Sequence, residues 1–291
     1  MKKIVVIGGG GGTSRIAECL RDEKGLEITA IITAFDTGGS TGRLRAEFGV
    51  PPLGDARHYL AALAKNRPLA ELFGFRFPKE SSLKGHALGN LIMLALFLKN
   101  GDMPRTVKSA RKLLEARGNA MLATHDVAEL RAKMASGDIV KGESRIDARD
   151  QKKIREVFLS KRVKPNAAAL RSIRSADVIL IGPGDTYTSV IPNLLVPKIA
   201  EAIRKSSALK TFVANADAAV PRERAARDIL RYLDMKAFDF VIAPTRGLER
   251  YGRVVPVKAR RGLHDMRSLR RVICRQAYWP TSRRTSLATR P

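Results

Sequence analysis

Residues 3–21 read KIVVIGGGGGTSRIAECLR, and their pattern predicts the class of fold. A β-branched apolar run at 3–7 stops at five consecutive glycines, and apolar residues then recur at helical spacing over 14–21. A second apolar run, rich in Ile and Thr, follows at 27–35. The order strand, glycine loop, helix, strand predicts a parallel sheet with a right-handed crossover.

The same alternation continues along the chain and predicts an α/β protein: a three-layer α/β/α Rossmann-like fold with a mostly parallel sheet of five or six strands. Short alternating runs at about 120–159 predict a small β-hairpin insert within a single domain spanning 1–275. We expect residues 276–291, which lack apolar periodicity, to form a basic, disordered tail. Later strands are expected at 178–181, at 211–215 and, as the last strand, at 238–243. Residues 36–54 are expected to form a loop. Helices are expected at 55–65, 86–100, 104–117, 193–205, 221–233 and 265–275.

The composition is that of a globular protein, with 44% hydrophobic residues. The longest apolar patch, 91–98, is much shorter than the roughly 20 residues of a membrane-spanning helix. The two cysteines, Cys19 and Cys274, provide neither a disulfide framework nor metal-ligand spacing. We therefore expect a cytoplasmic protein with reduced thiols and no membrane contact.

The net charge is +26, because 54 Lys and Arg outnumber 28 Asp and Glu. Such a charge attracts polyanions, from nucleic acids to phosphorylated metabolites. Aromatic residues are scarce at 5%, and no zinc-finger, basic-zipper or RNA-recognition pattern is present. The sequence thus does not favour specific nucleic-acid binding, although a basic nucleic-acid-binding or scaffold protein is one alternative function.

Five polar, glycine-rich segments interrupt the apolar runs, and the first and last directly follow a predicted strand. In an open α/β sheet such turns gather at one edge, where ligands bind. Glycine there lets backbone N–H groups approach a phosphate closely. We therefore predict one anion-binding crevice at the carboxyl edge of the sheet. The segments are 8–14, 36–43, 54–57, 85–90 and 182–189.

The first segment fits neither common phosphate-binding fingerprint. A dinucleotide motif would need glycine at Thr13 or Arg15, and a P-loop would need a lysine that is absent. A phosphate-holding turn before a helix still fits. The residues expected to present backbone groups to the phosphates are Gly9, Gly10, Gly11, Gly12, Gly38, Gly39 and Ser40.

Four charged residues are candidates for the same site. Asp36 ends a predicted strand, where it can bind a ribose, hold Mg²⁺ through one carboxylate and waters, or cap a turn. Arg43 can clamp an anion. Asp55 is either a helix N-cap or a catalytic carboxylate. The helix dipole disfavours a cation at Arg57, so this residue predicts a ligand or a carboxylate partner.

Two further segments contribute polar side chains. His86 and Asn90 share a helix face in the predicted helix, where His86 is either a catalytic acid/base and phosphate donor or a structural residue. The last segment places Gly184, Tyr187 and Ser189 at the same edge, partly as a helix cap. The remaining histidines, expected at the surface or in local hydrogen bonds, are His58, His125 and His264.

Taken in order, six segments resemble the gluconeogenesis-factor (YvcK-type) branch of the CofD-like superfamily, which is related to 2-phospho-L-lactate transferase. The resemblance covers about residues 3–215 and continues more weakly to 265. It implies a Rossmann-like cytoplasmic protein, and the motifs are closer to this branch than to the transferases. The segments are 8–14, 35–45, 52–57, 85–90, 142–144 and 182–195.

For this branch the resemblance implies a nucleotide diphosphate or nucleotide-sugar ligand of the UDP-sugar type, and a role in carbon metabolism and cell shape. Arg43 and Arg57 would neutralise the phosphates, Asn215 would line the site, and Tyr187 or Tyr251 would stack on the base. No cofactor follows from this reading, and a homo-oligomer is compatible with it.

The related transferases imply an alternative: transfer of a phospholactyl group from a guanosine diphosphate-linked donor to a deazaflavin hydroxyl, with Mg²⁺. Asp36 or Asp55 would hold the metal and His86 would assist the acceptor. Two departures bear on this alternative. Gly11 stands where the family has Thr, and Thr37 stands where a second Asp or Asn is common, which removes one potential metal ligand.

Overall fold

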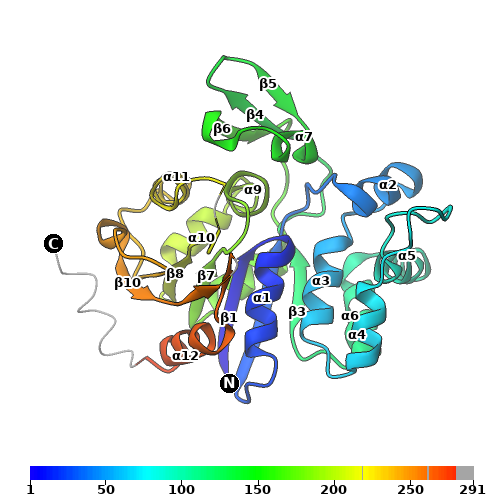
Figure 1. Ribbon diagram of the computed structural model, residues 1–291, viewed down its shortest axis with the longest axis horizontal. Helices are drawn as coiled ribbons and strands as arrows, with labels where there is room; N and C mark the ends of the chain where they lie inside the picture. Colours follow the sequence, from blue (N-terminus) through cyan, green and yellow to red (C-terminus); the bar gives the residue numbers. More distant parts are fainter. Residues whose placement is uncertain (218, 261, 280–291) are drawn as a thin grey trace.

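The computed structural model describes residues 1–217, 219–260 and 262–279. Its centre is a seven-stranded sheet in the order β10-β9-β8-β7-β1-β2-β3, and every neighbouring pair is parallel. This confirms the predicted Rossmann-like fold, with more strands than expected (Figure 1). The strands are β1 (Lys2–Gly8), β2 (Leu26–Ile32), β3 (Asn119–Leu122), β7 (Val178–Ile181), β8 (Leu209–Val213), β9 (Phe240–Ala243) and β10 (Arg253–Pro256).

The strand order reverses direction once, between β1 and β7. From β1 the chain proceeds outward through β2 to β3, and it then returns to pair β7 with β1 before proceeding outward the other way. Ligands of open α/β sheets bind at the carboxyl ends of strands beside such a switch point. Here those ends carry two of the predicted glycine-rich segments, 8–14 and 182–189.

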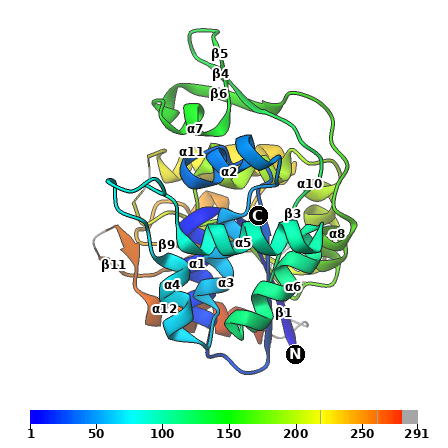
Figure 2. The ribbon, with the colours of Figure 1, turned by 90° about the vertical axis from the view of Figure 1, so that its right-hand side faces the viewer.

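Helices cover both faces of the sheet. Figure 2 shows α1, α3 and α12 on one side of β1 and β3, and α8 and α10 on the other. The helices are α1 (Gly10–Leu20), α2 (Gly39–Phe48), α3 (Gly54–Ala62), α4 (Arg67–Gly74), α5 (Leu88–Asn100), α6 (Met103–Leu114), α8 (Ala167–Arg174), α9 (Ile191–Leu194), α10 (Ile199–Lys205), α11 (Arg222–Leu233) and α12 (Met266–Ala277).

Several predicted elements need correction. The segment expected to be a loop at 36–54 contains α2, and the strand β10 follows the one expected to be last. The helix expected at 193–205 is divided into α9 and α10, because Pro197 interrupts it and Lys198 adopts a left-handed conformation. Helix α12 continues to Ala277, and residues 280–291 of the predicted tail lie outside the described residues.

The antiparallel insert contains the predicted hairpin, formed by β4 and β5, and a third strand, β6. The three strands of the insert are ordered β5-β4-β6, and the segment at 119–122 belongs to the main sheet instead. Figure 1 shows the insert above the carboxyl edge of the main sheet. The insert comprises β4 (Leu130–Met134), β5 (Ile139–Lys141), α7 (Glu143–Asp147), the short helix η1 (Gln151–Lys153) and β6 (Ile154–Leu159).

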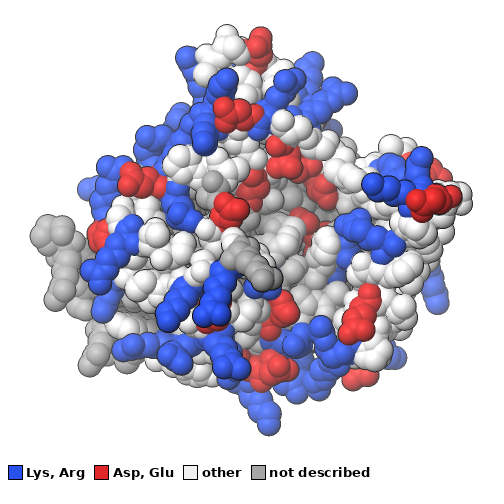
Figure 3. Space-filling model, viewed as in Figure 1, with Lys and Arg blue, Asp and Glu red and all other residues white. Residues whose placement is uncertain are grey.

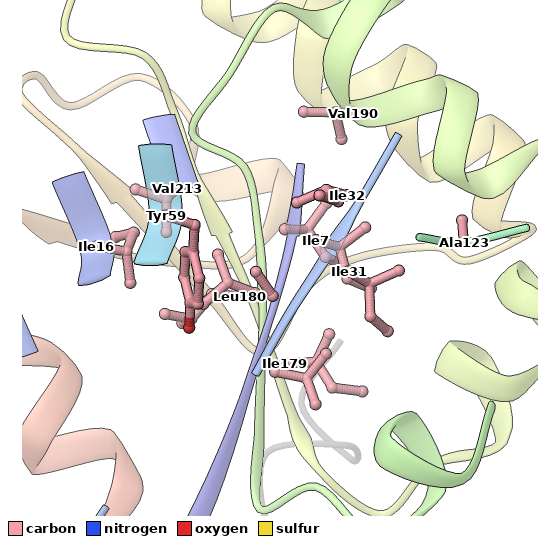
Figure 4. Packing of buried hydrophobic residues seen from close by; sticks show 14 of the residues in the cluster. Ile7, Ile16, Ile31, Ile32, Tyr59, Ala123, Ile179, Leu180, Val190 and Val213 are labelled. Carbon is pink, nitrogen blue, oxygen red and sulfur yellow. The ribbon is translucent and has the colours of Figure 1, made fainter. Parts of the chain in front are cut away.

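The core fills both spaces between the sheet and the helices. Ile16 of α1 and Tyr59 of α3 pack on one side of the sheet, and Ile31 and Ile179 point to the other (Figure 4). Strand β1 is apolar on both faces from Ile4 to Ile7, as a central parallel strand requires. In the described part of the chain, no helix is both long and apolar enough to cross a membrane.

Candidate functional site

Three helices begin at the carboxyl edge with glycine and without a side-chain cap. Helices α1, α2 and α3 begin at Gly10, Gly39 and Gly54, and none of their N-cap residues has a side chain that accepts a hydrogen bond from the first turn. The first N–H groups of a helix have no partner within the helix, and the dipole gives this end partial positive charge. The three starts therefore favour an anion.

The glycine-rich segments predicted to converge do so. A Cβ atom added at Gly9 would lie 2.7 Å from Asp55 Oδ2 and 3.4 Å from Ser189 Cβ. One added at Gly184 would lie 3.6 Å from the carbonyl oxygen of Gly9. The loops after β1 and β7 and the start of α3 therefore meet at the switch point, where the sequence predicts the anion-binding crevice.

Three neighbouring glycines of the first loop have different roles. A Cβ at Gly12 would lie 2.1 Å from the carbonyl oxygen of Pro183, so only glycine allows the two loops to approach this closely. Gly10 has a φ of +56°, which favours glycine. Gly11 is exposed, and a Cβ there would meet nothing within 4 Å, so this position faces open space.

Three carboxyl groups from different elements lie close together, and we call them the acidic cluster: Asp36, Asp55 and Glu143. Asp36 Oδ1 accepts a hydrogen bond from Gly38 N at 2.8 Å. Glu143, from the insert, accepts from Thr37 N at 3.2 Å and reaches the same loop. Figure 3 shows acidic side chains around the hollow beneath the insert, whereas Lys and Arg are more frequent over the rest of this face.

The surroundings disfavour ionisation of two members of the acidic cluster. Burial is the main cause that raises the pKa of Asp55 to about 7, and the neighbouring Asp36 adds to it against the opposing effects of Gly10 N–H and Arg57. Burial and then Asp36 likewise raise the pKa of Glu143 to about 7. A cation or a proton would relieve this repulsion.

Behind the start of α2 lies a buried chain of hydrogen bonds, which we call the Ser40 network. Ser40 Oγ pairs with His86 Nδ1 at 3.0 Å and accepts from Asn90 Nδ2 at 2.9 Å. Asn90 Oδ1 in turn accepts from Arg57 Nε at 3.0 Å. His86 precedes α5 rather than lying within it, and burial followed by the charge of Arg43 lowers the pKa of His86, which favours the neutral ring.

The two arginines predicted to bind phosphate differ. Arg57 is buried, and beyond Asn90 it donates to the carbonyl oxygen of Phe73 at 3.2 Å and contacts His58. Its hydrogen bonds therefore go to an amide and a carbonyl, and the nearby Asp55 carboxylate interacts with Arg57 through charge alone. Arg43 is exposed and donates to the carbonyl oxygen of Lys84 at 2.7 Å, so it lies at the surface near the Ser40 network.

Beyond β7, the predicted site residues are engaged with the protein itself. Asn215 makes two hydrogen bonds of 2.9 Å with the backbone of Gly184, one accepted and one donated. Tyr187 is 1% exposed and donates to Asp228 at 2.6 Å, so its ring presents no face for a base to stack on. Ser189 lies against Gly9 and remains at the crevice.

Tyr251 does not lie at the crevice, because it directly precedes β10 and therefore sits at the amino edge of the parallel sheet. Its ring is buried beneath Arg250. His264 is not at the surface either, since its buried Nε2 pairs with the carbonyl oxygen of Ala214 at 2.7 Å. The prediction of Tyr251 as a stacking residue is wrong, because the length of the parallel sheet separates the amino edge, where Tyr251 lies, from the carboxyl edge, where the crevice is expected.

Three residues that were not among the predicted site residues contact the crevice loops. Glu143 completes the acidic cluster, Thr37 hydrogen-bonds the insert, and Arg45 donates to the carbonyl oxygen of Asp36. The motif at 142–144 was the available signal for Glu143. The contact itself could not be predicted, because a local sequence pattern does not show which distant loop a residue of the insert will meet.

Carboxylate oxygens are the ligands that Mg²⁺ prefers, usually one or two together with substrate phosphates. In the described ranges, no three His, Cys, Asp or Glu side chains are placed to hold a metal ion by themselves. The donor set thus fits a cation shared with a bound phosphate, through Asp36 or Asp55, rather than a complete protein-only site.

A family model described as 2-phospho-L-lactate transferase CofD matches residues 4–276. The chain belongs to the CofD family. Its relatives include the gluconeogenesis factor of Halalkalibacterium halodurans, 46% identical over 74% of this chain and 66% of the relative. That of Bacillus subtilis is 45% identical over 73% and 67%, respectively. These relatives confirm the resemblance to the gluconeogenesis-factor branch.

Two broader matches extend this family assignment. A putative gluconeogenesis factor of Thermotoga maritima is 39% identical over 86% of this chain and 82% of the relative. A crystal structure of a Bacillus halodurans protein superposes with a TM-score of 0.83 at 32% identity, covering 94% of this chain and 99% of that one. The match to the H. halodurans factor spans slightly less than two thirds of the length of that relative.

Proposed function

We propose that this CofD-family protein binds a nucleotide diphosphate or nucleotide-sugar, of the UDP-sugar type, in the crevice between β1 and β7. The observation that carries this proposal is the convergence of three uncapped, glycine-led helix starts at the switch point of the sheet. Their N–H groups would hold the diphosphate, and exposed Arg43 would approach it from the rim.

In this proposal Arg57 acts through the protein rather than on the ligand. It fixes Asn90, which holds Ser40 at the start of α2. The names of the relatives, gluconeogenesis factors, support a role in carbon metabolism. A regulatory role, a cytoplasmic location and an effect on cell shape belong to the same proposal.

Calorimetry with UDP-glucose, UDP-N-acetylglucosamine and GDP tests the binding. We expect one of them to bind, and Gly11→Glu to weaken it at least tenfold, because Gly11 faces open space at the start of α1 and the added carboxylate would repel phosphate. Gly11→Gln has similar size without the charge and should bind more tightly than Gly11→Glu. No heat with any of these ligands and folded wild-type protein would overturn the proposal.

The acidic cluster favours a second candidate, a Mg²⁺-dependent transferase of phosphorus-containing groups. When bound beside a diphosphate, Mg²⁺ would neutralise the charge that builds up during transfer. Asp36 and Asp55 would hold it, and His86, kept in position by Ser40, would exchange a proton with the acceptor hydroxyl. Product formation from a GDP-linked donor and a deazaflavin acceptor, lost in Asp55→Asn, would support transfer, and Mg²⁺-independent binding without turnover would exclude it.

A further inference from the structure

A groove of about 790 Å³ runs along the outer strand of the insert, and most of the side chains that line it are exposed. One wall is β5 with the turn before it, and the other is α7 with the chain that follows it to η1. Figures 1 and 2 show β4 and β5 at the end of the insert that lies away from the main sheet. None of the residues predicted for the nucleotide site lines this groove.

The backbone of β5 has an unpaired edge beside the groove. Met134 N of β4 donates to the carbonyl oxygen of Asp138, two residues before Val140. Because hydrogen bonding alternates along an antiparallel pair, Val140 faces β4, and the N–H and C=O groups of Ile139 and Lys141 point the other way. In the order β5-β4-β6, no strand of the described chain covers that side. Such an edge can accept a further strand from another chain.

The groove is basic, and its cations are available. Among the described residues, none of its four Lys and Arg side chains forms an ion pair or a side-chain hydrogen bond, whereas both acids of the lining already have donors. Ser136 Oγ donates to Asp138 at 2.7 Å, and Lys152 N donates to Asp150 at 3.1 Å. The lining therefore favours carboxylates from a partner. The four cations are Lys141, Arg145, Arg149 and Lys153.

The same lining selects a peptide over other polyanions and over a second copy of the chain. Ile139 is 53% exposed at the strand edge, where it can pack on an apolar side chain of an added strand. None of the described residues that line the groove is aromatic, so it offers no base-stacking surface. The net charge of +26 disfavours a second copy of the chain.

We propose that the insert binds an acidic segment of a partner protein by strand addition. The segment pairs with the free backbone groups of Ile139 and Lys141, and its carboxylates contact the Arg145 and Arg149 wall. Successive side chains of an extended peptide point to opposite faces, so one set meets the cations and the other set lies beside Ile139. The partner would dock on the insert without entering the crevice, so this proposal does not depend on nucleotide binding.

Three labelled peptides of equal length test this binding by fluorescence anisotropy. The first alternates Glu with Val over seven positions, the second has Lys in place of every Glu, and the third has proline in place of the middle Val. Proline keeps the charge of the first peptide and removes one backbone donor. We expect the first peptide to bind the wild type at least fivefold more tightly than either of the others.

Two pairs of variants place the peptide in the groove. Arg149→Glu should weaken the acidic peptide at least fivefold, whereas Arg117→Glu, the same change at an exposed position before β3, should alter it less than twofold. Ile139→Pro removes an N–H group from the free edge, where proline is tolerated, and should weaken the peptide at least threefold. Ile139→Thr keeps that N–H group and should bind more tightly than Ile139→Pro. Urea unfolding checks that each variant is folded.

Hydrogen exchange gives a second measurement. The amides of Ile139 and Lys141 should exchange at least tenfold more slowly with the acidic peptide bound, and that of Val140, which faces β4, should change less. Equal affinity for the Glu and Lys peptides, or equal effects of Arg149→Glu and Arg117→Glu, would overturn the proposal. So would a single-stranded oligonucleotide that binds at Arg149 when the acidic peptide does not. Gly11→Glu should weaken nucleotide binding and leave peptide affinity unchanged, so either proposal can fail alone.

Discussion

The two halves of the crevice both contain polar, glycine-rich segments, but the surroundings of these segments differ. In the first half, from β1 to α3, the helices begin with glycine and have no side-chain N-cap. The carboxyl group of Asp55 is buried there beside that of Asp36. In the second half, from β7 to β8, the polar side chains satisfy the protein, as with Asn215 on Gly184 and Tyr187 on Asp228. A polar, glycine-rich loop therefore indicates a ligand site where the helix after it has no side-chain N-cap, as at α1, and a structural turn where a side chain caps it, as Asp185 does after β7.

The largest expected effect concerns the contact between the halves. Gly12→Ala would place a Cβ 2.1 Å from the Pro183 carbonyl oxygen, and neither backbone segment can yield easily. We expect a loss of about 3 kcal/mol or more in the free energy of unfolding, measured by urea denaturation. The matched control is Gly11→Ala one position earlier, where alanine meets nothing and should stabilise α1 by about 0.5–1 kcal/mol. Equal stability of the two variants would contradict the close packing.

The second prediction concerns the buried carboxyl group of the first half. Asp55 has a pKa raised from 3.8 to about 7 in the folded protein. Between these values the unfolded chain is ionised while the folded protein is still protonated, so stability falls as pH rises, by about 1.4 kcal/mol per unit. Asp55→Asn mimics the protonated group. It should therefore match the wild type near pH 4 and exceed it at pH 8 by up to about 4 kcal/mol.

Urea unfolding at several pH values measures this difference. Asp22→Asn, at a side chain that is 86% exposed, serves as the control and should leave the pH profile unchanged. A variant that is less stable than the wild type at pH 8 would show that the Asp55 carboxylate is compensated in the folded protein.

The third prediction tests whether the second half is structural. Tyr187→Phe removes the hydrogen bond to Asp228 and should cost about 1–2 kcal/mol of stability, without changing nucleotide affinity. Ser40→Ala, in the first half, should cost a similar amount and also weaken the nucleotide, because Ser40 holds the start of α2. Calorimetry and urea unfolding together separate the two. A loss of affinity in Tyr187→Phe alone would reverse the assignment of the halves.

The comparison also explains what the sequence could predict. The sheet followed from β-branched runs such as 3–7 and 178–181, since local periodicity carries that information. Convergence of the loops followed from parallel topology. The hydrogen-bond partners of the site residues could not be predicted from the sequence. No local pattern shows that Arg57 donates to the Phe73 carbonyl, that Tyr187 donates to Asp228, or that Glu143 accepts from Thr37 N. Such pairings depend on contacts between residues far apart in the chain.

The smallest expected effect concerns the insert, which is tied to both halves. Thr37 Oγ1 accepts from Ser144 N at 3.1 Å on the first side, and Gln151 Nε2 donates to Asp185 at 2.6 Å on the second. Thr37→Val removes exposed hydrogen bonds only and should cost about 0.5–1 kcal/mol.

Hydrogen exchange measures where that loss falls. Because the contact joins the insert to the body, Thr37→Val should speed exchange in β4 and β6 and leave β1 and β7 unchanged. Gln151→Leu, at a side chain that is itself buried, should speed exchange in the insert more strongly. Faster exchange throughout the main sheet in Thr37→Val would mean that the insert supports the whole fold rather than covering one crevice.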